Sequence, residues 1–433
     1  MATKRVKPVA GFKRLLFVVI LLLSLVLLTG IGGVVKDKRP AQVFSENLDQ
    51  LDADEMISRA IVGTLYYDFD RWFPQFRKRI STLENKTPAI ANRLELMKFH
   101  FYLAGLLAEL SHVLSFTSKY KIDSIRDDFD RNSKRAKELA EDILEMPGIS
   151  KDQQAEAYFY LGASEGYVGI VEYGAGHILS ALMNGLNADN HLEDALDLDP
   201  RYNDAYVGLG VYEYGNTRIG GISNFLMQGG RDLRLQGLKH IEHALKGPIL
   251  SRPLALKTLI WFYISEQINP DNASAEQGQP LSPGVCRKRA LELLMEYESR
   301  YFKETAPDQF IGNKGLSMMK AIQFVLDRNY DNARKQFQKV LTISSYLEKT
   351  KGYNINPALA KTVKEGIRFC DLMIASGKNA GNVDSAVCPK IEKQIDFIEN
   401  GGSMVEYESS KIRGEIQNVF HQRLKEMHDH RDC

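Results

Sequence analysis

A pair of similar segments in the middle of the chain constrains its fold most strongly. Residues 157–162 (AYFYLG) return as residues 205–210 (AYVGLG), and each copy precedes a short apolar stretch, at 191–196 (HLEDAL) and 240–245 (HIEHAL). Both pairs recur at nearly the same offset, so the repeating unit has about fifty residues, a period typical of solenoids. Solenoids mostly present surfaces to other macromolecules, so the repeat favours a binding function.

The composition favours an all-α protein that does not bind nucleic acid. The 433 residues include 56 basic and 55 acidic side chains, which gives a net charge of +1. A nucleic-acid-binding protein would normally carry a basic surplus on one face. Strand-like alternation of apolar and polar residues is scarce, so we expect helices throughout.

The N-terminal region predicts a membrane segment. Residues 15–28 (LLFVVILLLSLVLL) are apolar, and no charge occurs between residues 15 and 35, while about 20 apolar residues suffice to cross a bilayer. We predict an uncleaved signal anchor at 15–35, with a cleaved signal peptide as the alternative. The N-terminus is expected in the cytoplasm, because basic residues precede the run: Lys4, Arg5, Lys7, Lys13 and Arg14. The protein would then be single-pass in the inner membrane, with its main domain periplasmic or otherwise extracytoplasmic.

The cysteines indicate no metal site. Cys286, Cys370, Cys388 and Cys433 form neither CxxC nor any compact zinc spacing. In an oxidising compartment Cys370 and Cys388 are the favoured disulfide pair, because the glycines between them allow the chain to turn. Isolated buried thiols are the alternative.

The paired segments resemble tetratricopeptide (TPR) repeats. The TPR pattern has an aromatic residue and Leu-Gly on a first helix, then Ala, an apolar residue and Ala on a second helix, and a closing Pro. The first copy supplies Tyr158, Leu161, Gly162, Ala188, Leu192, Ala195 and Pro200. The second copy supplies Tyr206, Leu209, Gly210, Gly237, Ile241, Ala244 and Pro248. The resemblance implies a right-handed superhelical solenoid of helical hairpins, similar to membrane-anchored bacterial TPR-like proteins of unknown function.

The two copies depart from a standard TPR unit, which has 34 residues. Each carries an insertion between its helices, at about residues 169–186 and 215–235. We interpret these insertions as lengthened helices or Gly-hinged loops.

The expected organisation has five parts. They are a basic cytoplasmic N-terminus (1–14), the transmembrane anchor (15–35), a juxtamembrane helical segment (36–93), the TPR-like repeat domain (94–376) and a polar C-terminal helical extension (377–433). A capping helix is expected at 358–375, and another helix at 409–427.

No motif predicts catalysis or a cofactor. The chain lacks GxSxG, HExxH, a phosphate-binding P-loop and a Rossmann fingerprint, so we predict a protein that is not an enzyme. His191 and His240 occupy matching places in the two copies, which indicates a structural role. His240 and His243 share a helical face but lack a third ligand. The C-terminal tail is richer in metal-binding side chains but is terminal, and we predict no functional metal site there: His421, His428, His430 and Cys433.

Two sets of residues are candidates for binding. The TPR resemblance implies a concave groove lined by first-helix side chains, here Glu156, Phe159, Tyr167, Asp204, Val207, Val211 and Tyr214. For Tyr167 and Tyr214, packing between helices is the alternative. The insertions supply an apolar patch of Ile178, Leu182, Met183, Ile222 and Phe225. Such stripes usually belong to a core, but if exposed they would contact a partner or the membrane interface.

These observations predict a non-catalytic, membrane-anchored TPR-like scaffold. It would bind a protein partner in the groove and act in the assembly or organisation of an envelope complex. The alternative is a binding or carrier module, in which a helical cavity beside the insertions holds a lipid or another small apolar ligand.

Overall fold

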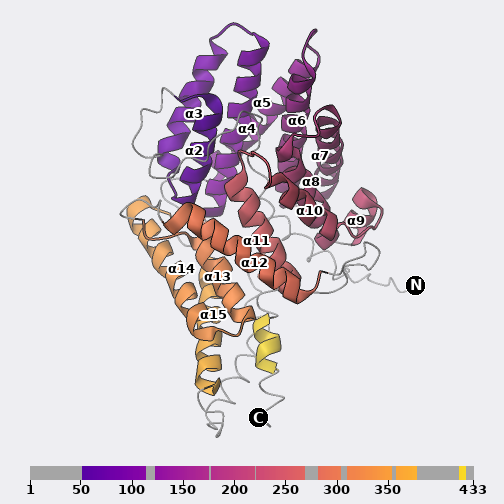
Figure 1. Ribbon diagram of the computed structural model, residues 1–433. Coiled ribbons are helices and arrows are strands. Elements are labelled where there is room, and N and C mark those ends of the chain that lie inside the picture. Colours follow the sequence, from indigo (N-terminus) through magenta and orange to yellow (C-terminus); the bar gives the residue numbers. More distant parts are fainter. Residues whose placement is uncertain are drawn as a thin grey trace, which may run out of the picture.

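A computed structural model describes residues 51–113, 122–174, 177–219, 221–268, 281–303, 310–353, 357–377 and 419–425. Within these ranges the regular structure is entirely helical (Figure 1), which confirms the expected all-α class. The predicted anchor at 15–35 lies outside the described residues. Among the helices that are described, none is both long and apolar enough to cross a membrane.

Most of the chain forms helices that run one after another with short connections. In chain order they are α2 (Ala53–Leu65), α3 (Phe69–Glu84), α4 (Ile90–Val113), α5 (Ile122–Leu144), α6 (Lys151–Gly174), α7 (Ile178–Leu198), α8 (Asn203–Ile219), α9 (Gly221–Gln228), α10 (Arg234–Ala244), α11 (Arg252–Ile268), α12 (Pro283–Glu298), the π-helical turn η4 (Ser299–Lys303), α13 (Lys314–Leu326), α14 (Tyr330–Lys351) and α15 (Pro357–Gly377). Neighbours pack in pairs: α4 with α5, α6 with α7, α8 with α10, α11 with α12, and α13 with α14.

Local sequence signals define several helix ends. The side chain of Asp52 accepts a hydrogen bond from the backbone N–H of Glu55 at the start of α2. Ser282 caps α12, and the proline that follows it occupies the first turn, where no N–H is needed. Gly352 ends α14 with a φ of 69°, a left-handed conformation that glycine adopts without strain.

The first helices pack against the late ones. The ring of Tyr66, after α2, lies 4.7 Å from that of Phe310 between centroids. The hydroxyl of Tyr67 accepts a hydrogen bond of 2.7 Å from the backbone N–H of Lys314, and Lys351 Nζ donates to the carbonyl oxygen of Tyr67 at 2.8 Å. Figure 1 accordingly shows α2 and α3 above α13 and α14, so that residues far apart in sequence share one core.

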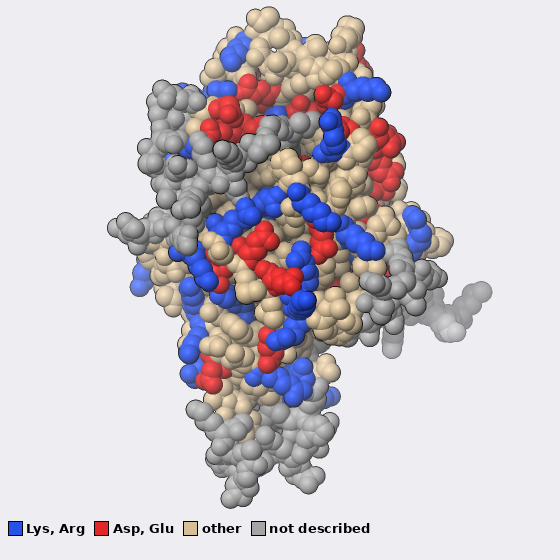
Figure 2. Space-filling model, viewed as in Figure 1, with Lys and Arg blue, Asp and Glu red and all other residues tan. Residues whose placement is uncertain are grey.

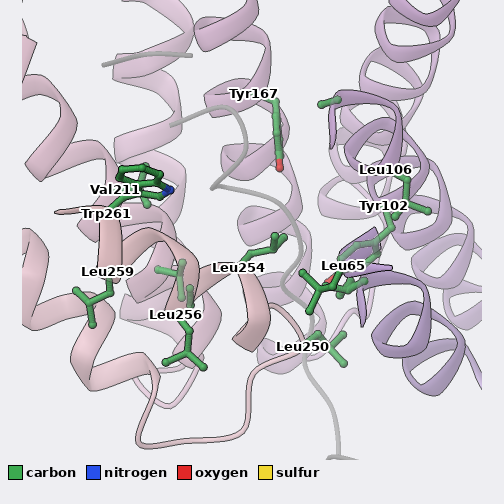
Figure 3. Packing of buried hydrophobic residues seen from close by; sticks show 14 of the residues in the cluster. Leu65, Tyr102, Leu106, Tyr167, Val211, Leu250, Leu254, Leu256, Leu259 and Trp261 are labelled. Carbon is green, nitrogen blue, oxygen red and sulfur yellow. The ribbon is translucent and has the colours of Figure 1, made fainter. Parts of the chain in front are cut away.

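Buried side chains from many helices meet in that core. Figure 3 shows Leu65 of α2, Tyr102 of α4, Tyr167 of α6 and Val211 of α8 together with leucines of α11. Helix α11 is buried along almost its whole length. The inner faces of the hairpins are therefore covered by other helices of the same chain.

The C-terminal helices close this core at its lower end. Helix α15 matches the predicted capping helix and packs against α14. Residues 419–425 are helical, and Phe420 stacks on Phe369 of α15 with 4.7 Å between ring centroids. The rest of the helix predicted at 409–427 lies outside the described residues.

Candidate functional site

The two copies of the repeat form hairpins with the same close approach. A Cβ atom added at Gly162 of α6 would lie 3.0 Å from the carbonyl oxygen of Ala188 in α7. One added at Gly210 of α8 would lie 2.5 Å from the carbonyl oxygen of Gly237 in α10. In both hairpins the backbones are thus in contact at the glycine of the Leu-Gly motif, where a Cβ atom is crowded at Gly162 and does not fit at Gly210 without a shift.

A glutamate–histidine pair lies beside each glycine. His191 Nδ1 is 2.7 Å from Glu165 Oε2, and His240 Nδ1 is 2.8 Å from Glu213 Oε2. The matching histidines therefore make the same contact, each with a buried carboxylate on the first helix of its hairpin. Within the described part of the chain, no group of three or more metal-ligating side chains is present. His428, His430 and Cys433 of the predicted tail lie outside that part.

The two glutamates were missed by the sequence analysis, although a signal for them exists. Glu165 and Glu213 are 48 residues apart (213 − 165), the same offset as between Tyr158 and Tyr206. A side-chain amide on the second helix accompanies each pair: Asn187 Nδ2 lies 3.5 Å from Glu165 Oε1, and Gln236 Nε2 lies 2.5 Å from Glu213 Oε1. Extending the repeat alignment by three residues beyond the Leu-Gly motif would have found them.

The surroundings of the two pairs differ in charge. Lys137 Nζ, from α5, lies 3.1 Å from Glu165 Oε1 and balances its charge. Glu213 instead has Asp189 of α7 nearby. Burial, together with Glu193 and Glu213, raises the pKa of Asp189 to about 7. The second pair therefore has a second carboxyl group beside it, that of Asp189, whose raised pKa lies near neutral pH.

The predicted groove residues are buried, so their interpretation as an exposed binding surface is wrong. The relative exposure is at most 8% for all seven: Glu156, Phe159, Tyr167, Asp204, Val207, Val211 and Tyr214. For Tyr167 and Tyr214, the alternative of packing between helices is what the structure shows. The Tyr214 ring stacks on Phe262 of α11 at 3.7 Å, and Tyr167 lies 5.8 Å from Phe101 of α4, measured between ring centroids.

The polar members of the predicted groove are engaged in interior contacts. Glu156 Oε1 lies 2.7 Å from Lys98 Nζ of α4, and Asp204 accepts a hydrogen bond from Ser251. The Tyr214 hydroxyl is 2.9 Å from Glu266, a carboxylate whose pKa is raised by its burial. Helices α4 and α11 thus occupy the side on which a partner was expected.

The insertions consist mainly of lengthened helices. The first forms the end of α6 and the first turns of α7, and the second forms the end of α8, the extra helix α9 and the start of α10. Helix α9 lies against α7, because a Cβ atom at Gly185 would overlap the methyl group of Met227. Figure 1 shows α9 at the right-hand edge of the molecule.

Hydrogen bonds and two glycines hold α9 in place. Thr217 Oγ1 of α8 donates to Gln228 Oε1 at 3.1 Å, and Gln228 Nε2 donates to the carbonyl oxygen of Glu213 at 3.3 Å. Gly229 and Gly230 then turn the chain towards α10 with φ values of 62° and 76°. These two glycines therefore form a tight turn after α9.

Several apolar residues of the insertions are exposed. The relative exposure is 76% for Leu179, 54% for Met183, 66% for Phe225 and 56% for Leu226. We call these four side chains the α7–α9 surface. Leu182 of the predicted patch is half-buried, and the side chains of Ile178 and Ile222 lie outside the described structure.

The structure describes two of the four cysteines. Cys286 and Cys370 are buried thiols, and burial raises the pKa of each to about 12. Cys388 lies outside the described residues, so its pairing with Cys370 stays a prediction. A thiol with so high a pKa is a poor nucleophile.

Comparisons with known proteins do not assign the chain to a family. No protein-family model matches it, and no curated protein and no solved structure shows significant similarity to it. Function must therefore be argued from the residues.

Proposed function

We propose that this chain is a non-catalytic scaffold held in the inner membrane by one N-terminal helix, with a TPR-like repeat domain on the extracytoplasmic side. There it binds a protein partner and assembles or organises an envelope complex. The observation that carries the proposal is the repetition of one hairpin geometry in α6–α7 and in α8–α10.

The matching contacts support a repeat architecture. Gly162 and Gly210 each touch the backbone of a second helix, and Glu165 and Glu213 each bind a histidine of that helix. Stacked hairpins of this kind, arranged as a right-handed superhelix, commonly provide surfaces for macromolecules. Since the inner face of this array is covered by α4 and α11, the proposal places the partner on an outer face.

The N-terminal sequence supports a position at the membrane. The uncharged run at 15–35 has the length that a bilayer requires, and basic residues precede it. The same run favours an anchor over a buried core helix, because a core helix seldom needs so many consecutive apolar residues.

The surface charge favours a protein partner over a nucleic acid. On the face shown in Figure 2, basic side chains border acidic ones and neither sign covers a large area. The net charge of +1 agrees with this mixture. Phosphate backbones attract continuous basic surfaces, whereas mixed charges are common at the rims of protein interfaces.

No specific observation favours the alternative of a lipid or small-ligand carrier. A Cβ atom added at Gly169 of α6 would lie 3.2 Å from the carbonyl oxygen of Ala181 in α7, so these two helices touch behind the first insertion. Leu179 and Met183 point outward instead of lining an enclosed space.

Affinity purification from native membranes tests partner binding. The tagged full chain should recover a stoichiometric extracytoplasmic protein after mild detergent extraction. The control is a fusion of residues 1–50 to the same tag, which keeps the predicted anchor but lacks the helices. Recovery of the same proteins by both baits would contradict the proposal.

A reporter fused after Cys433 tests the topology. We expect activity from a reporter that works only outside the cytoplasm, and none from one that works only inside it. The reverse result would overturn the predicted orientation.

A further inference from the structure

The four residues of the α7–α9 surface belong to two uncharged stretches of the sequence. Residues 173–188 and 219–230 contain no Asp, Glu, Lys or Arg, although 26% of the whole chain is charged. Charged groups begin only at the borders, with Glu172 and Asp189 around the first stretch and Arg218 and Arg231 around the second. The absence of charge is therefore concentrated at one place in the fold.

The exposure of apolar side chains is concentrated there too. Leu179, Met183, Phe225 and Leu226 are four of the seven large hydrophobic residues that are exposed in the described part of the chain. Two of them lie one turn apart on α7 and two are adjacent on α9, which packs against α7, and exposed apolar surfaces of this kind mark sites that are covered in use. The hydrogen bonds of Gln228 keep α9 in position, so the surface is built into the fold.

The character of the surface fits a lipid bilayer better than a protein. A standard protein interface involves about 20–30 residues on each side, with aromatic residues, Met and Arg enriched and a polar rim, so four exposed apolar side chains are few for such an interface. The α7–α9 surface consists of two leucines, a methionine and a phenylalanine, all within uncharged segments of the sequence. Side chains of this type insert at the boundary between headgroups and acyl chains without needing polar partners.

The predicted anchor would bring this surface within reach of the bilayer. The anchor ends at residue 35, and the described structure begins at Leu51. The residues between them, 36–50, span at most about 50 Å when fully extended, while a folded chain of this length has a radius of gyration of about 22 Å. The tether keeps the domain close to the membrane and makes the encounter intramolecular, so a small surface suffices.

We propose that the α7–α9 surface docks into the extracytoplasmic leaflet of the membrane that holds the anchor. Docking rests on the anchor of the proposed function and adds an orientation to it, because two points of attachment fix which face of the repeat domain points away from the bilayer. Since the surface is uncharged, docking requires neither anionic lipid nor low ionic strength.

A tryptophan reporter tests the contact with lipid. The full chain with Phe225→Trp is reconstituted in phosphatidylcholine vesicles with or without bromine on the acyl chains, which quenches tryptophan only at close range. Trp72 and Trp261 are buried and give the background, which the unmodified chain measures. The matched control is Val285→Trp on α12, a residue that is 60% exposed and lies outside the surface.

We expect bromine to quench the Phe225→Trp chain beyond the unmodified chain, equally at low and high salt, and to leave the Val285→Trp chain at background. Adding Leu226→Asp to the Phe225→Trp chain should remove the extra quenching while the helical circular dichroism stays unchanged. If that variant misfolds, Leu179→Asp serves in its place.

Quenching of Phe225→Trp no greater than that of Val285→Trp would overturn the docking. A blue-shifted emission without bromine quenching would assign the surface to a protein occupant, such as a second copy of this chain, and would overturn it as well. Resistance to alkaline carbonate extraction reports on the anchor separately. A chain that resists extraction but shows no quenching refutes only the docking, whereas a chain that is released refutes the anchor.

Discussion

The close approach of α8 and α10 predicts that alanine at Gly210 will separate the two helices. The added Cβ atom would lie 2.5 Å from the carbonyl oxygen of Gly237 and 2.7 Å from Ile241 Cγ1. The first of these is a backbone atom that cannot rotate away. Overpacking costs about 1–3 kcal/mol and the upper end applies here, while replacing a helical glycine by alanine gains about 1 kcal/mol. We therefore expect Gly210→Ala to lose about 2 kcal/mol of stability.

Gly166→Ala is the matched control, because it makes the same chemical change in an equivalent hairpin. A Cβ atom at Gly166 would meet only the Cβ of Ala188, at 3.7 Å, which is ordinary van der Waals contact. This variant should gain up to about 1 kcal/mol from helix propensity alone. Gly162→Ala, with its nearest atom at 3.0 Å, should fall between the two.

Thermal unfolding of the full chain in detergent, followed by circular dichroism at the helical band, measures the order of stability of these variants. We expect the midpoints to fall from Gly166→Ala through the unmodified chain to Gly210→Ala. A difference of about 3 kcal/mol corresponds to a gap of several degrees for a protein of this size. The reasoning is refuted if Gly210→Ala unfolds at the same temperature as Gly166→Ala or above it.

Two further substitutions test the polar interior. The pKa of Asp189 is raised to about 7, so between the ordinary value of 3.8 and 7 the native chain holds a proton that the unfolded chain has lost, and stability falls as pH rises through this range. Asp189→Asn should therefore stabilise the fold by about 1–2 kcal/mol above pH 7, a figure reduced for partial solvent exposure, and should give no gain in stability below pH 3.8. A gain in stability that does not depend on pH would contradict this reasoning. Tyr214→Phe removes the hydroxyl next to the buried Glu266 and should cost about 1–2 kcal/mol in chemical denaturation, whereas an unchanged midpoint would show that the contact is not formed.

The sequence was sufficient to predict the fold class and the paired hairpins, because both depend on local patterns. Gly162 and Gly210 occupy the same place in a motif, and the close helix contact that the motif implies is present at both. The partners Glu165 and Glu213 were equally accessible from the repeat offset, since the signal lies in the spacing of the residues.

Whether the predicted groove is open or covered could not be predicted from the sequence. A repeat motif shows which residues face the inner side of an array, but not what covers that side. The covering of Tyr167 by Phe101 and of Tyr214 by Phe262 depends on contacts between residues about fifty or more positions apart. No local pattern encodes such a closure.

In the insertions the sequence failed in the opposite way, because apolar residues whose pattern indicates a buried face are exposed. An apolar stripe such as that around Met183 reads as part of a core, because periodicity indicates one apolar face without indicating whether anything packs on it. The lack of charge from residue 173 to 188 was visible in the sequence. Only the exposure of Leu179 and Phe225 in the structure indicates that this uncharged stretch contributes to an apolar surface.

Chemical crosslinking in intact cells, followed by mass spectrometry, tests the scaffold most directly. The account predicts crosslinks from exposed lysines on one contiguous outer face of the described helices to the same extracytoplasmic protein, and none from the α7–α9 surface side, which faces lipid. Crosslinks confined to the chain itself, or crosslinks to cytoplasmic proteins, would contradict a membrane-held scaffold that binds a partner outside the cytoplasm.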